Sequence, residues 1–544
     1  MKKLLLLFFW LLISLPATKA DTGYYFYVQL KDKNNNPYSL SNPAEFLSQR
    51  AIDRRKKFHI DIDSTDLPVS PSYTSEVTAT GIMVHSRSKW MNGLTVLTTD
   101  SSVMSQIRAL SFVKFVQYTG KTTTAFSVIS RAKLKTDSLT YGSATTQINI
   151  INANQIHAEG YLGQDMIIGV LDAGFYHADQ NPGLDSLRLQ DRLLGTKDII
   201  APGNNVFNED THGANVLSIM AGNLPGQYLG SAPQASYWLI RTEYAPTEYL
   251  VETDFWAAGI EFADSVGVDA INSSLGYTEF DDTTMNYTYA DMDGNVSRAS
   301  RAAYLAARKG IIVCNSAGNE GNDTWHYIGA PADADSIFSV GAVTSNETAS
   351  YFTSWGPTSD GRVKPEVCAQ GSATAYVAYT GTPSSGNGTS YSSPVITGTV
   401  TCLMQKYSDK ADTTLLIKLA NLRNAVISSS NLYLSPSAQL GYGIPDFVKA
   451  DSLLSKYYAT DNENQNSDLV TFINDQQSLT ISKTIATNTD ELHIYIYTTS
   501  GILVYKFSFS NSELAIPVNI FNTGIYIIRI TDNKNFQVAK FLIN

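Results

Sequence analysis

Residues 166–172 read Met-Ile-Ile-Gly-Val-Leu-Asp, a nearly continuous apolar run that ends in a carboxylate, and this stretch decides the fold class. Such a run is typical of a strand that is covered on both faces of a sheet. Apolar residues recur at helical spacing in residues 248–265, and residues 268–271 form the next strand-like run. The alternation repeats in residues 297–309 and 311–314. The pattern predicts an α/β fold in which a mostly parallel sheet has helices on both faces.

Polar residues stand where these predicted strands end. Asp172 follows the first strand, Ser273-Ser274-Leu275-Gly276 follows the second, and Ala317-Gly318-Asn319 follows the third. In open sheets of this kind, ligands bind outside the carboxyl ends of the strands. We therefore expect the functional site at this edge of the sheet.

A histidine and a serine complete a candidate catalytic set with Asp172. His212 lies in Asp210-Thr211-His212-Gly213, where a polar stretch gives way to a helical pattern. Ser390 lies in Gly388-Thr389-Ser390-Tyr391-Ser392-Ser393-Pro394, ahead of an apolar helix that we expect to hold Pro394 in its first turn. The free backbone donors of a helix start favour developing negative charge at Ser390. Each motif alone also fits an ordinary helix cap.

The three residues occur in the order Asp, His, Ser, which is the order found in subtilisin. On these motifs and Ser316-Ala317-Gly318-Asn319, the chain resembles the subtilisin-like serine proteases from about residue 147 to residue 452. The resemblance implies an endopeptidase that cleaves proteins or peptides through an acyl-enzyme. It implies Ser390 as nucleophile, His212 as general base, Asp172 as the group that orients the base, and Asn319 as an oxyanion-hole donor. It also implies that Ser273 to Gly276 pair with the backbone of the substrate.

The chain departs from the family pattern beside two of these residues. Ala173 and Ala214 stand where the family usually has hydroxyl side chains, so we expect looser surroundings for the Asp and the His. No cofactor is expected, and no metal ligands are assigned. The family often uses structural calcium, and solvated surface charge is the alternative interpretation of the loop carboxylates that could bind it. These carboxylates are Asp281, Asp282, Asp291 and Asp293.

The first twenty residues match a secretory signal. Lys2 and Lys3 precede the apolar run 4–16, and Ala20 ends a stretch of small residues. The run is shorter than the roughly 20 residues that span a bilayer. We therefore predict a signal peptide at 1–20, a secreted or cell-surface location, and no stable insertion into a membrane.

Two polar stretches, residues 121–146 and 459–468, have the composition of linkers and divide the rest of the chain. Residues 21–120 then form a small α+β domain that resembles the propeptides of the same family, with a permanent accessory domain as the alternative. Residues 147–458 form the catalytic domain.

The charge is distributed unevenly between these regions. Residues 21–120 carry 11 Lys/Arg against 9 Asp/Glu, whereas residues 121–466 carry 20 against 35. Complementary fields would speed docking of the chain's own propeptide. The net charge of -11 for the whole chain argues against a nucleic-acid partner.

Residues 469–544 contain short β-rich runs separated by Gly, Asn, Asp and Ser, which predict a small β-sandwich. Gly524-Ile525-Tyr526-Ile527-Ile528-Arg529 and Ala539-Lys540-Phe541-Leu542 resemble the sorting tails of type IX secretion substrates. The resemblance implies the type IX secretion machinery as a partner. An adhesion or carbohydrate-binding module would show a similar pattern.

The sequence thus predicts a secreted, subtilisin-like serine endopeptidase that is made as a precursor. Two alternatives stay open: a non-catalytic scaffold that keeps the fold, and a surface adhesion protein whose C-terminal module carries the function.

Overall fold

The computed structural model describes residues 22–122, 140–408 and 419–463, and then 470–474, 478–483, 491–498, 503–517, 521, 524–531 and 536–543. The predicted signal peptide lies outside the described residues, as do most of the first predicted linker and the end of the second. The chain forms two compact units, Met1–Asp451 and Ser452–Asn544. None of the described helices is long and apolar enough to cross a membrane.

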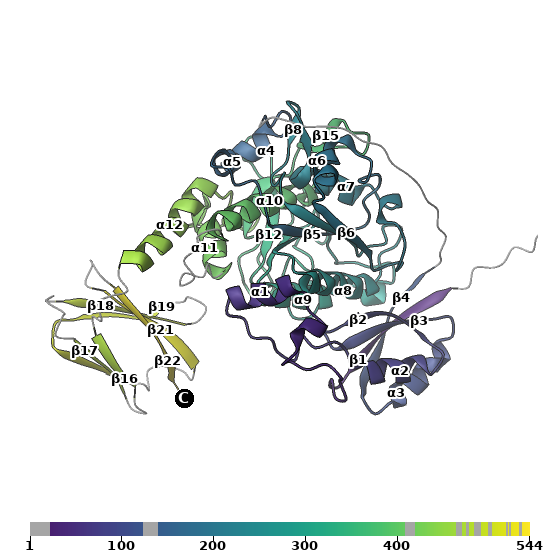
Figure 1. Ribbon diagram of the computed structural model, residues 1–544, viewed down its shortest axis with the longest axis horizontal. Helices are drawn as coiled ribbons and strands as arrows, with labels where there is room; N and C mark the ends of the chain where they lie inside the picture. The colour runs from purple at the N-terminus through teal and green to yellow at the C-terminus, as the bar shows by residue number, and fades with distance from the viewer. Residues whose placement is uncertain are drawn as a thin grey trace, which may run out of the picture. The chain divides into compact units, whose positions relative to one another are not determined.

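A seven-stranded sheet organises the first unit (Figure 1). Its strands lie in the order β13-β12-β11-β10-β5-β9-β6, and every neighbouring pair is parallel. The central strands are apolar because both of their faces are buried. The predicted mostly parallel sheet is therefore confirmed. The strands are β5 (Ile167–Asp172), β6 (Leu193–Asp198), β9 (Ser236–Arg241), β10 (Ala270–Ser273), β11 (Ile312–Ser316), β12 (Phe338–Val343) and β13 (Val367–Gln370).

Helices cover both faces of this sheet, as predicted. α8 (Val251–Val266) and α9 (Arg298–Arg308) lie between the sheet and the N-terminal domain, whereas α7 (His212–Ala221) and α10 (Thr389–Ser408) lie on the opposite side (Figure 1). Small alanine side chains on the buried face of α9 allow it to pack closely. Shorter or peripheral helices complete the unit: α4 (Thr145–Asn149), α5 (Ala153–Ala158), α6 (Asp185–Leu189) and α11 (Leu419–Ser429). α12 (Phe447–Glu463) begins in this unit and continues past its last residue, Asp451.

The N-terminal domain is a four-stranded antiparallel sheet with helices, in the order β2-β3-β1-β4. Its own core includes Phe26, Val28, Leu94 and Ile107. Three of its elements, α1, α2 and β4, were not predicted from the sequence. The elements are β1 (Gly23–Leu30), α1 (Gln49–Lys57), α2 (Pro71–Thr78), β2 (Met83–Ser88), β3 (Gly93–Thr98), α3 (Met104–Ala109) and β4 (Val113–Thr122).

Buried charges join the N-terminal domain to α8. Asp264 is fully buried and forms ion pairs with Arg54, with Arg55 at 2.9 Å and with Lys89 at 3.0 Å. Burial opposes ionisation of this carboxyl, but the three cations together hold its pKa far below the usual range. One turn earlier on α8, Glu261 accepts hydrogen bonds from Ser88 Oγ and from two backbone N–H groups of the N-terminal domain. Further ion pairs across this interface lie outside α8, between Arg50 and Asp269 and between Lys309 and Asp66.

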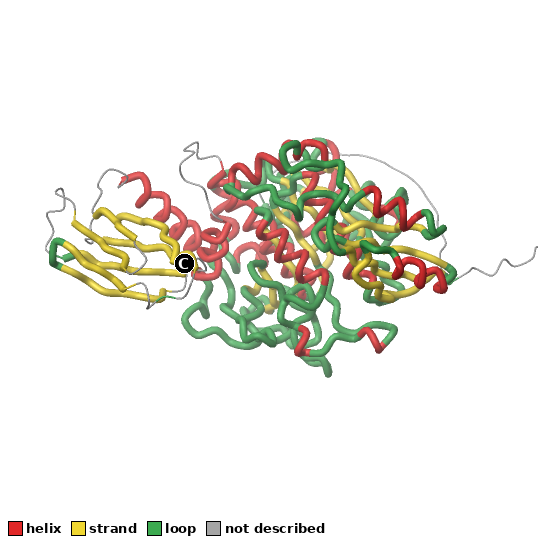
Figure 2. The backbone as a smooth tube through the Cα atoms, turned by 90° about the horizontal axis from the view of Figure 1, so that it is seen from below, coloured by secondary structure: helices red, strands yellow, loops and turns green. Residues whose placement is uncertain are grey.

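The second unit consists of two antiparallel sheets, β16-β17-β20 and β19-β18-β21-β22. Apolar residues of both sheets, such as Ile481 and Ile516 from one and Ile494 and Ile528 from the other, form one shared core. The predicted β-sandwich is therefore observed, with β17 and β20 as strands that the sequence analysis missed (Figure 2). The strands are β16 (Val470–Asn474), β17 (Ser478–Lys483), β18 (Leu492–Thr498), β19 (Leu503–Phe509), β20 (Glu513–Pro517), β21 (Gly524–Thr531) and β22 (Phe536–Ile543).

Loss of the Asp264 charge is expected to weaken the full chain. Asp264→Asn leaves buried cations without their partner, and we expect the free energy of unfolding in urea to fall by about 3 to 5 kcal/mol. The control is Asp53→Asn, which removes an exposed carboxylate 3.8 Å from Lys56 and should change the value by less than about 0.5 kcal/mol. Equal losses in the two variants would contradict this account of the interface.

Candidate active site

Asp172 ends β5 at the carboxyl edge of the sheet and is fully buried. Its Oδ1 accepts a hydrogen bond from the backbone N–H of Ala173 at 2.9 Å and lies 2.8 Å from His212 Nδ1. The hydrogen bond to His212 joins two residues that are 40 positions apart in the chain. The structure therefore brings together the first two members of the predicted set.

His212 is the first residue of α7, and its backbone N–H donates to Asp210 Oδ1 at 2.7 Å. The next residue must be small because the start of α7 touches the end of β5. A Cβ atom at Gly213 would lie 2.3 Å from the carbonyl oxygen of Gly174 and 2.8 Å from Cβ of Asp172. Gly213 thus allows the approach that places the imidazole beside the carboxylate.

The surroundings of His212 favour its charged form. Burial by itself lowers the pKa of an imidazole, but the Asp172 carboxylate, with smaller contributions from Asp210 and Glu243, outweighs this and raises the pKa of His212 to about 9. The side chain is 31% exposed, so one side of the ring faces outward. A histidine in this setting can take up a proton and be stabilised as an imidazolium.

Ser390 is the second residue of α10, which corrects the sequence prediction for this helix. We expected Pro394 in the first turn, but α10 begins at Thr389 and Pro394 lies inside it. Proline lacks the N–H that would bond to the carbonyl oxygen four residues earlier, which belongs to Ser390. That oxygen instead accepts a hydrogen bond from Ser274 Oγ at 2.9 Å, so the helix continues through the proline.

The Ser390 hydroxyl is not hydrogen-bonded to His212. Ser390 Oγ donates to the carbonyl oxygen of Ser274 at 3.3 Å, and no hydrogen bond joins Ser390 to His212, both of which the structure describes. The ring of the adjacent Tyr391 lies 6.1 Å from the imidazole ring, centroid to centroid. Such hydrogen bonds are often long in enzymes without substrate and shorten when substrate binds.

Asn319 is exposed, and its side chain is hydrogen-bonded through its carbonyl oxygen. Its Oδ1 accepts hydrogen bonds from the backbone N–H of Thr389 at 2.8 Å and from Thr389 Oγ1 at 3.1 Å. Nδ2 has no hydrogen-bond partner among the residues that the structure describes. The amide N–H groups are thus available next to the residue before Ser390.

The segment Ser273 to Gly276 is mostly occupied by contacts inside the protein. Ser273 Oγ accepts a hydrogen bond from Trp256 at 2.9 Å, and the carbonyl oxygen of Leu275 accepts one from Asn315 at 3.0 Å. Ser274 binds Ser390 as described above. Gly276 is the exposed residue of the segment. The part that a peptide could reach is therefore its carboxyl end.

One supporting residue, Asn272, was missed in the sequence analysis. Its Oδ1 accepts hydrogen bonds from Ser393 Oγ at 3.0 Å and Thr397 Oγ1 at 2.8 Å, which fixes α10 against β10. Its Nδ2 donates to Ser274 Oγ at 3.2 Å. Two hydroxyl side chains four residues apart on a buried face of α10 were the available signal.

The alanine side chains beside Asp172 and His212 provide no hydrogen-bond donor. Ala173 contributes only its backbone N–H to Asp172, and Ala214 is fully buried. Asp172 Oδ2 has no hydrogen-bond partner among the described residues. A hydroxyl side chain at position 173 would be a natural donor to this oxygen. The looser surroundings expected for Asp172 and His212 stay a prediction.

Three of the four loop carboxylates form local turns, whereas Asp281 Oδ2 accepts a hydrogen bond from the backbone N–H of Glu248 at 3.4 Å. Asp282 Oδ1 caps Thr284, Asp291 Oδ2 binds Thr288, and Asp293 Oδ1 accepts from Asn295. Among the residues that the structure describes, the group of three or more potential ligands that does converge is Glu243, Glu248 and Glu252. The sequence analysis did not single out any of these three.

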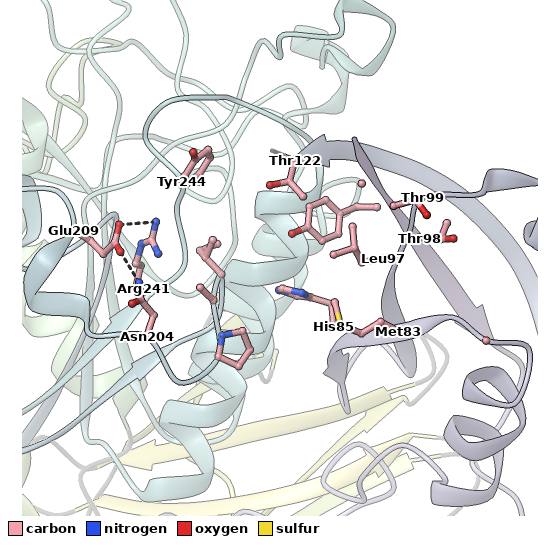
Figure 3. Close-up of a pocket in the computed structure, with 16 residues that line it drawn as sticks. Met83, His85, Leu97, Thr98, Thr99, Thr122, Asn204, Glu209, Arg241 and Tyr244 are labelled. Atoms are coloured by element: carbon pink, nitrogen blue, oxygen red, sulfur yellow. Dashed lines mark hydrogen bonds and ion pairs between the residues drawn. The ribbon is translucent and has the colours of Figure 1, made fainter. Parts of the chain in front are cut away.

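A cavity of about 710 Å³ lies between the N-terminal domain and the catalytic domain (Figure 3). Tyr25 and His85 line it from one side, and Glu209, Arg241 and Tyr244 from the other. None of Asp172, His212 and Ser390 lines it. This cavity is a feature of the domain interface and is separate from the candidate active site.

Comparison with known proteins gives three family matches along the chain. The models are the Peptidase S8 propeptide domain of Bacteroidota at residues 25–137, the Subtilase family at 163–443, and the Secretion system C-terminal sorting domain at 475–544. The match to the propeptide model covers the N-terminal domain, and the match to the sorting model covers most of the β-sandwich.

Individual relatives are similar to about half of the chain. The chain is 28% identical to Subtilisin DY of Bacillus licheniformis over 55% of its own length and 94% of that protein. It is 28% identical to Subtilisin E of Bacillus subtilis over 48% of its own length and 61% of that protein. A crystal structure of MycP1 without its N-terminal propeptide aligns with 57% of the chain and 98% of MycP1, with 19% identity and a TM-score of 0.42.

The subtilase family model covers just over half of the chain, including Asp172, His212, Asn319 and Ser390. The protein therefore belongs to the subtilase family and is a subtilisin-like serine peptidase.

Proposed function

We propose that the chain is the precursor of a secreted endopeptidase in which Asp172, His212 and Ser390 act as the catalytic triad. The observation that carries the proposal is the 2.8 Å hydrogen bond between His212 Nδ1 and a fully buried Asp172. Nε2 of the same ring can then accept the proton of the Ser390 hydroxyl. Ser390 lies in the first turn of α10. This arrangement supports an acyl-transfer mechanism.

In the proposed mechanism, Ser390 Oγ attacks the carbonyl carbon of the scissile peptide bond while His212 Nε2 accepts the hydroxyl proton. His212 then gives that proton to the leaving amine, and a water molecule hydrolyses the ester on Ser390 by the same route. Asp172 holds the ring in the required tautomer and stabilises the imidazolium. The raised pKa of His212, about 9, supports this role, because it reflects a stabilised charged form.

The proposed oxyanion donors are Asn319 Nδ2 and the backbone N–H of Ser390. Thr389 supports the assignment, since it binds Asn319 Oδ1 and thereby directs the N–H groups away from itself. Loss of one such donor typically reduces kcat by about 10² to 10³. Gly276, exposed at the end of Ser273 to Gly276, is the proposed point where the substrate backbone pairs with the enzyme.

We propose that the two flanking domains serve maturation and export. The N-terminal domain is the propeptide, and its buried contacts with Glu261 and Asp264 support tight association with the catalytic domain until it is cleaved. The β-sandwich is a sorting domain read by the type IX secretion machinery, which agrees with the match to a secretion-system sorting domain. Export would begin with the signal peptide at residues 1–20.

A serine-directed fluorophosphonate probe tests the proposed nucleophile. The protein, incubated until its N-terminal domain is removed, should carry one label, and mass spectrometry should place that label on Ser390. Ser390→Ala, treated alike with an added protease to remove the same domain, should not be labelled. Ser392→Ala is the matched control, because Ser392 Oγ is buried and bonds to the Thr389 carbonyl at 2.9 Å, and it should be labelled like the parent. Absence of label in the matured parent would instead support a non-catalytic scaffold or an adhesion protein.

The pH dependence of kcat/KM is expected to follow the charge of His212. Only the neutral ring can accept a proton, and its pKa is raised to about 9, so kcat/KM for a peptide substrate should rise with pH to a midpoint near 9. Asp210→Asn keeps an acceptor for the His212 N–H but removes a nearby negative charge, and should move the midpoint to lower pH.

The exposed Asp323 provides the control for this profile, because Asp323→Asn removes a surface charge that does not contact His212. Its midpoint should equal that of the parent. A parent midpoint below pH 7, or equal shifts in the two variants, would show that the Asp172 and Asp210 charges do not set the basicity of the ring.

A further inference from the structure

Three glutamates gather at the start of α8, near the proposed triad but outside it. Glu243 follows the end of β9, Glu248 lies in the loop, and Glu252 lies in the first turn of α8. One carboxylate oxygen of each lies within 4.8 Å of the others. None of the ion pairs found among the described residues involves any of these glutamates. The cluster therefore places up to three negative charges together without a cationic side chain.

The interior of this cluster has too few hydrogen-bond donors for its carboxylate oxygens. Glu252 is 2% exposed, and its Oε2 is buried without a hydrogen-bond partner among the described residues. Oε1 of Glu248 is also buried without a hydrogen-bond partner among the described residues. The Tyr277 hydroxyl binds Glu243 Oε2 at 3.2 Å, and further hydrogen bonds join Glu243 to Glu252 and Glu252 to the Tyr249 backbone. One buried oxygen of Glu248 and one of Glu252 still lack a donor, which leaves the arrangement incomplete.

Burial and mutual repulsion act in the same direction on these groups. Burial, followed by the charge of Asp172, raises the pKa of Glu243 to about 7. Burial and the charge of Glu243 raise that of Glu248 to about 9, and the pKa of Glu252 is also raised by burial and its two neighbours. Without a further positive charge, the cluster must hold protons at neutral pH.

The spacing of the oxygens suits a single ion. Calcium lies 2.3 to 2.6 Å from its oxygen ligands, so two ligands on opposite sides of it are about 5 Å apart. Three oxygens within 4.8 Å of one another can therefore contact one ion. All three donors are carboxylates, with no histidine or cysteine in the group, which is the ligand set of a hard cation.

We propose that Glu243, Glu248 and Glu252 bind one divalent hard cation, with calcium as the ion that fits best. The ion would supply the missing positive charge and would connect the end of β9, the loop and the start of α8. Thr242, the residue before Glu243, donates its backbone N–H to the carbonyl oxygen of Asp172 at 3.0 Å. The site would thus brace the loop that leaves the strand beside the proposed triad.

The number of calcium ions bound per chain tests this proposal. The full chain carrying Ser390→Ala, so that it stays intact, is freed of metal with a chelator, desalted and titrated calorimetrically with calcium. Glu252→Gln in the same background should bind one ion fewer than its parent. Asp282→Asn is the matched control, since it removes an exposed carboxylate that only caps Thr284, and it should bind the same number as the parent.

Thermal unfolding with and without calcium distinguishes ion binding by Glu252 from a purely structural role of this residue. In chelator, Glu252→Gln should unfold at the same temperature as the parent or higher, because a neutral amide replaces a buried carboxyl group that must otherwise take up a proton. In millimolar calcium, the parent should gain stability relative to the variant. If Glu252→Gln does not fold, terbium luminescence replaces it. Terbium bound at the site should be sensitised by Tyr277, and Tyr277→Phe should reduce that signal while it keeps all three carboxylates.

Two results would overturn the proposal: no calcium binding by the parent below about 1 mM, or an unchanged number of ions in a folded Glu252→Gln chain. An undiminished terbium signal in Tyr277→Phe would overturn it equally. None of these measurements requires peptidase activity, so the proposed triad and the proposed cation site can fail independently.

Discussion

A carboxylate that has been removed from water requires partners, and the structure around the proposed active site follows from how Asp172 obtains them. The end of β5 buries Asp172 completely, and one backbone N–H and the His212 imidazole are its hydrogen-bond partners. To supply the imidazole, α7 must begin against the sheet, and only a glycine at position 213 allows that approach. The same hydrogen bond gives His212 its raised pKa, so the burial of one side chain connects the fold to the chemistry.

Helix α8 shows the same constraint at both of its ends. Near its carboxyl end, Asp264 and Glu261 are buried and receive cations and N–H groups from the N-terminal domain. At its amino end, Glu252 is buried with two further carboxylates, and no ion pair among the described residues involves any of the three. One end is thus completed by another domain of the same chain, and the proposed ion would complete the other. Removal of the N-terminal domain would return Asp264 and Glu261 to water, which makes that interface suited to a temporary partner.

The fold class and the residues of the candidate site could be predicted because their signals are local. Apolar runs that end in Asp172, Ser273 or Ala317 identify strands and their functional edge together. The start of α10 could not be predicted, because Pro394 is tolerated through a hydrogen bond from Ser274, 116 positions away from Ser390. The glutamate cluster was missed for a similar reason, since acidic residues in a loop are usually solvated and only the packing of α8 buries Glu252. Loop carboxylates such as Asp282, which the sequence offered for calcium, instead form local turns.

The account depends on the hydrogen bond between Asp172 and His212, and the kinetics of Asp172→Asn test it most directly. Asparagine keeps the size of the side chain but removes the charge and favours the wrong tautomer of the ring. In the matured enzyme, freed of its N-terminal domain by an added protease where needed, kcat for a peptide substrate should fall about 10⁴-fold while the circular dichroism spectrum is unchanged. A fall of less than tenfold in a correctly folded variant would contradict the central claim, because it would show that Asp172 does not orient or charge the base.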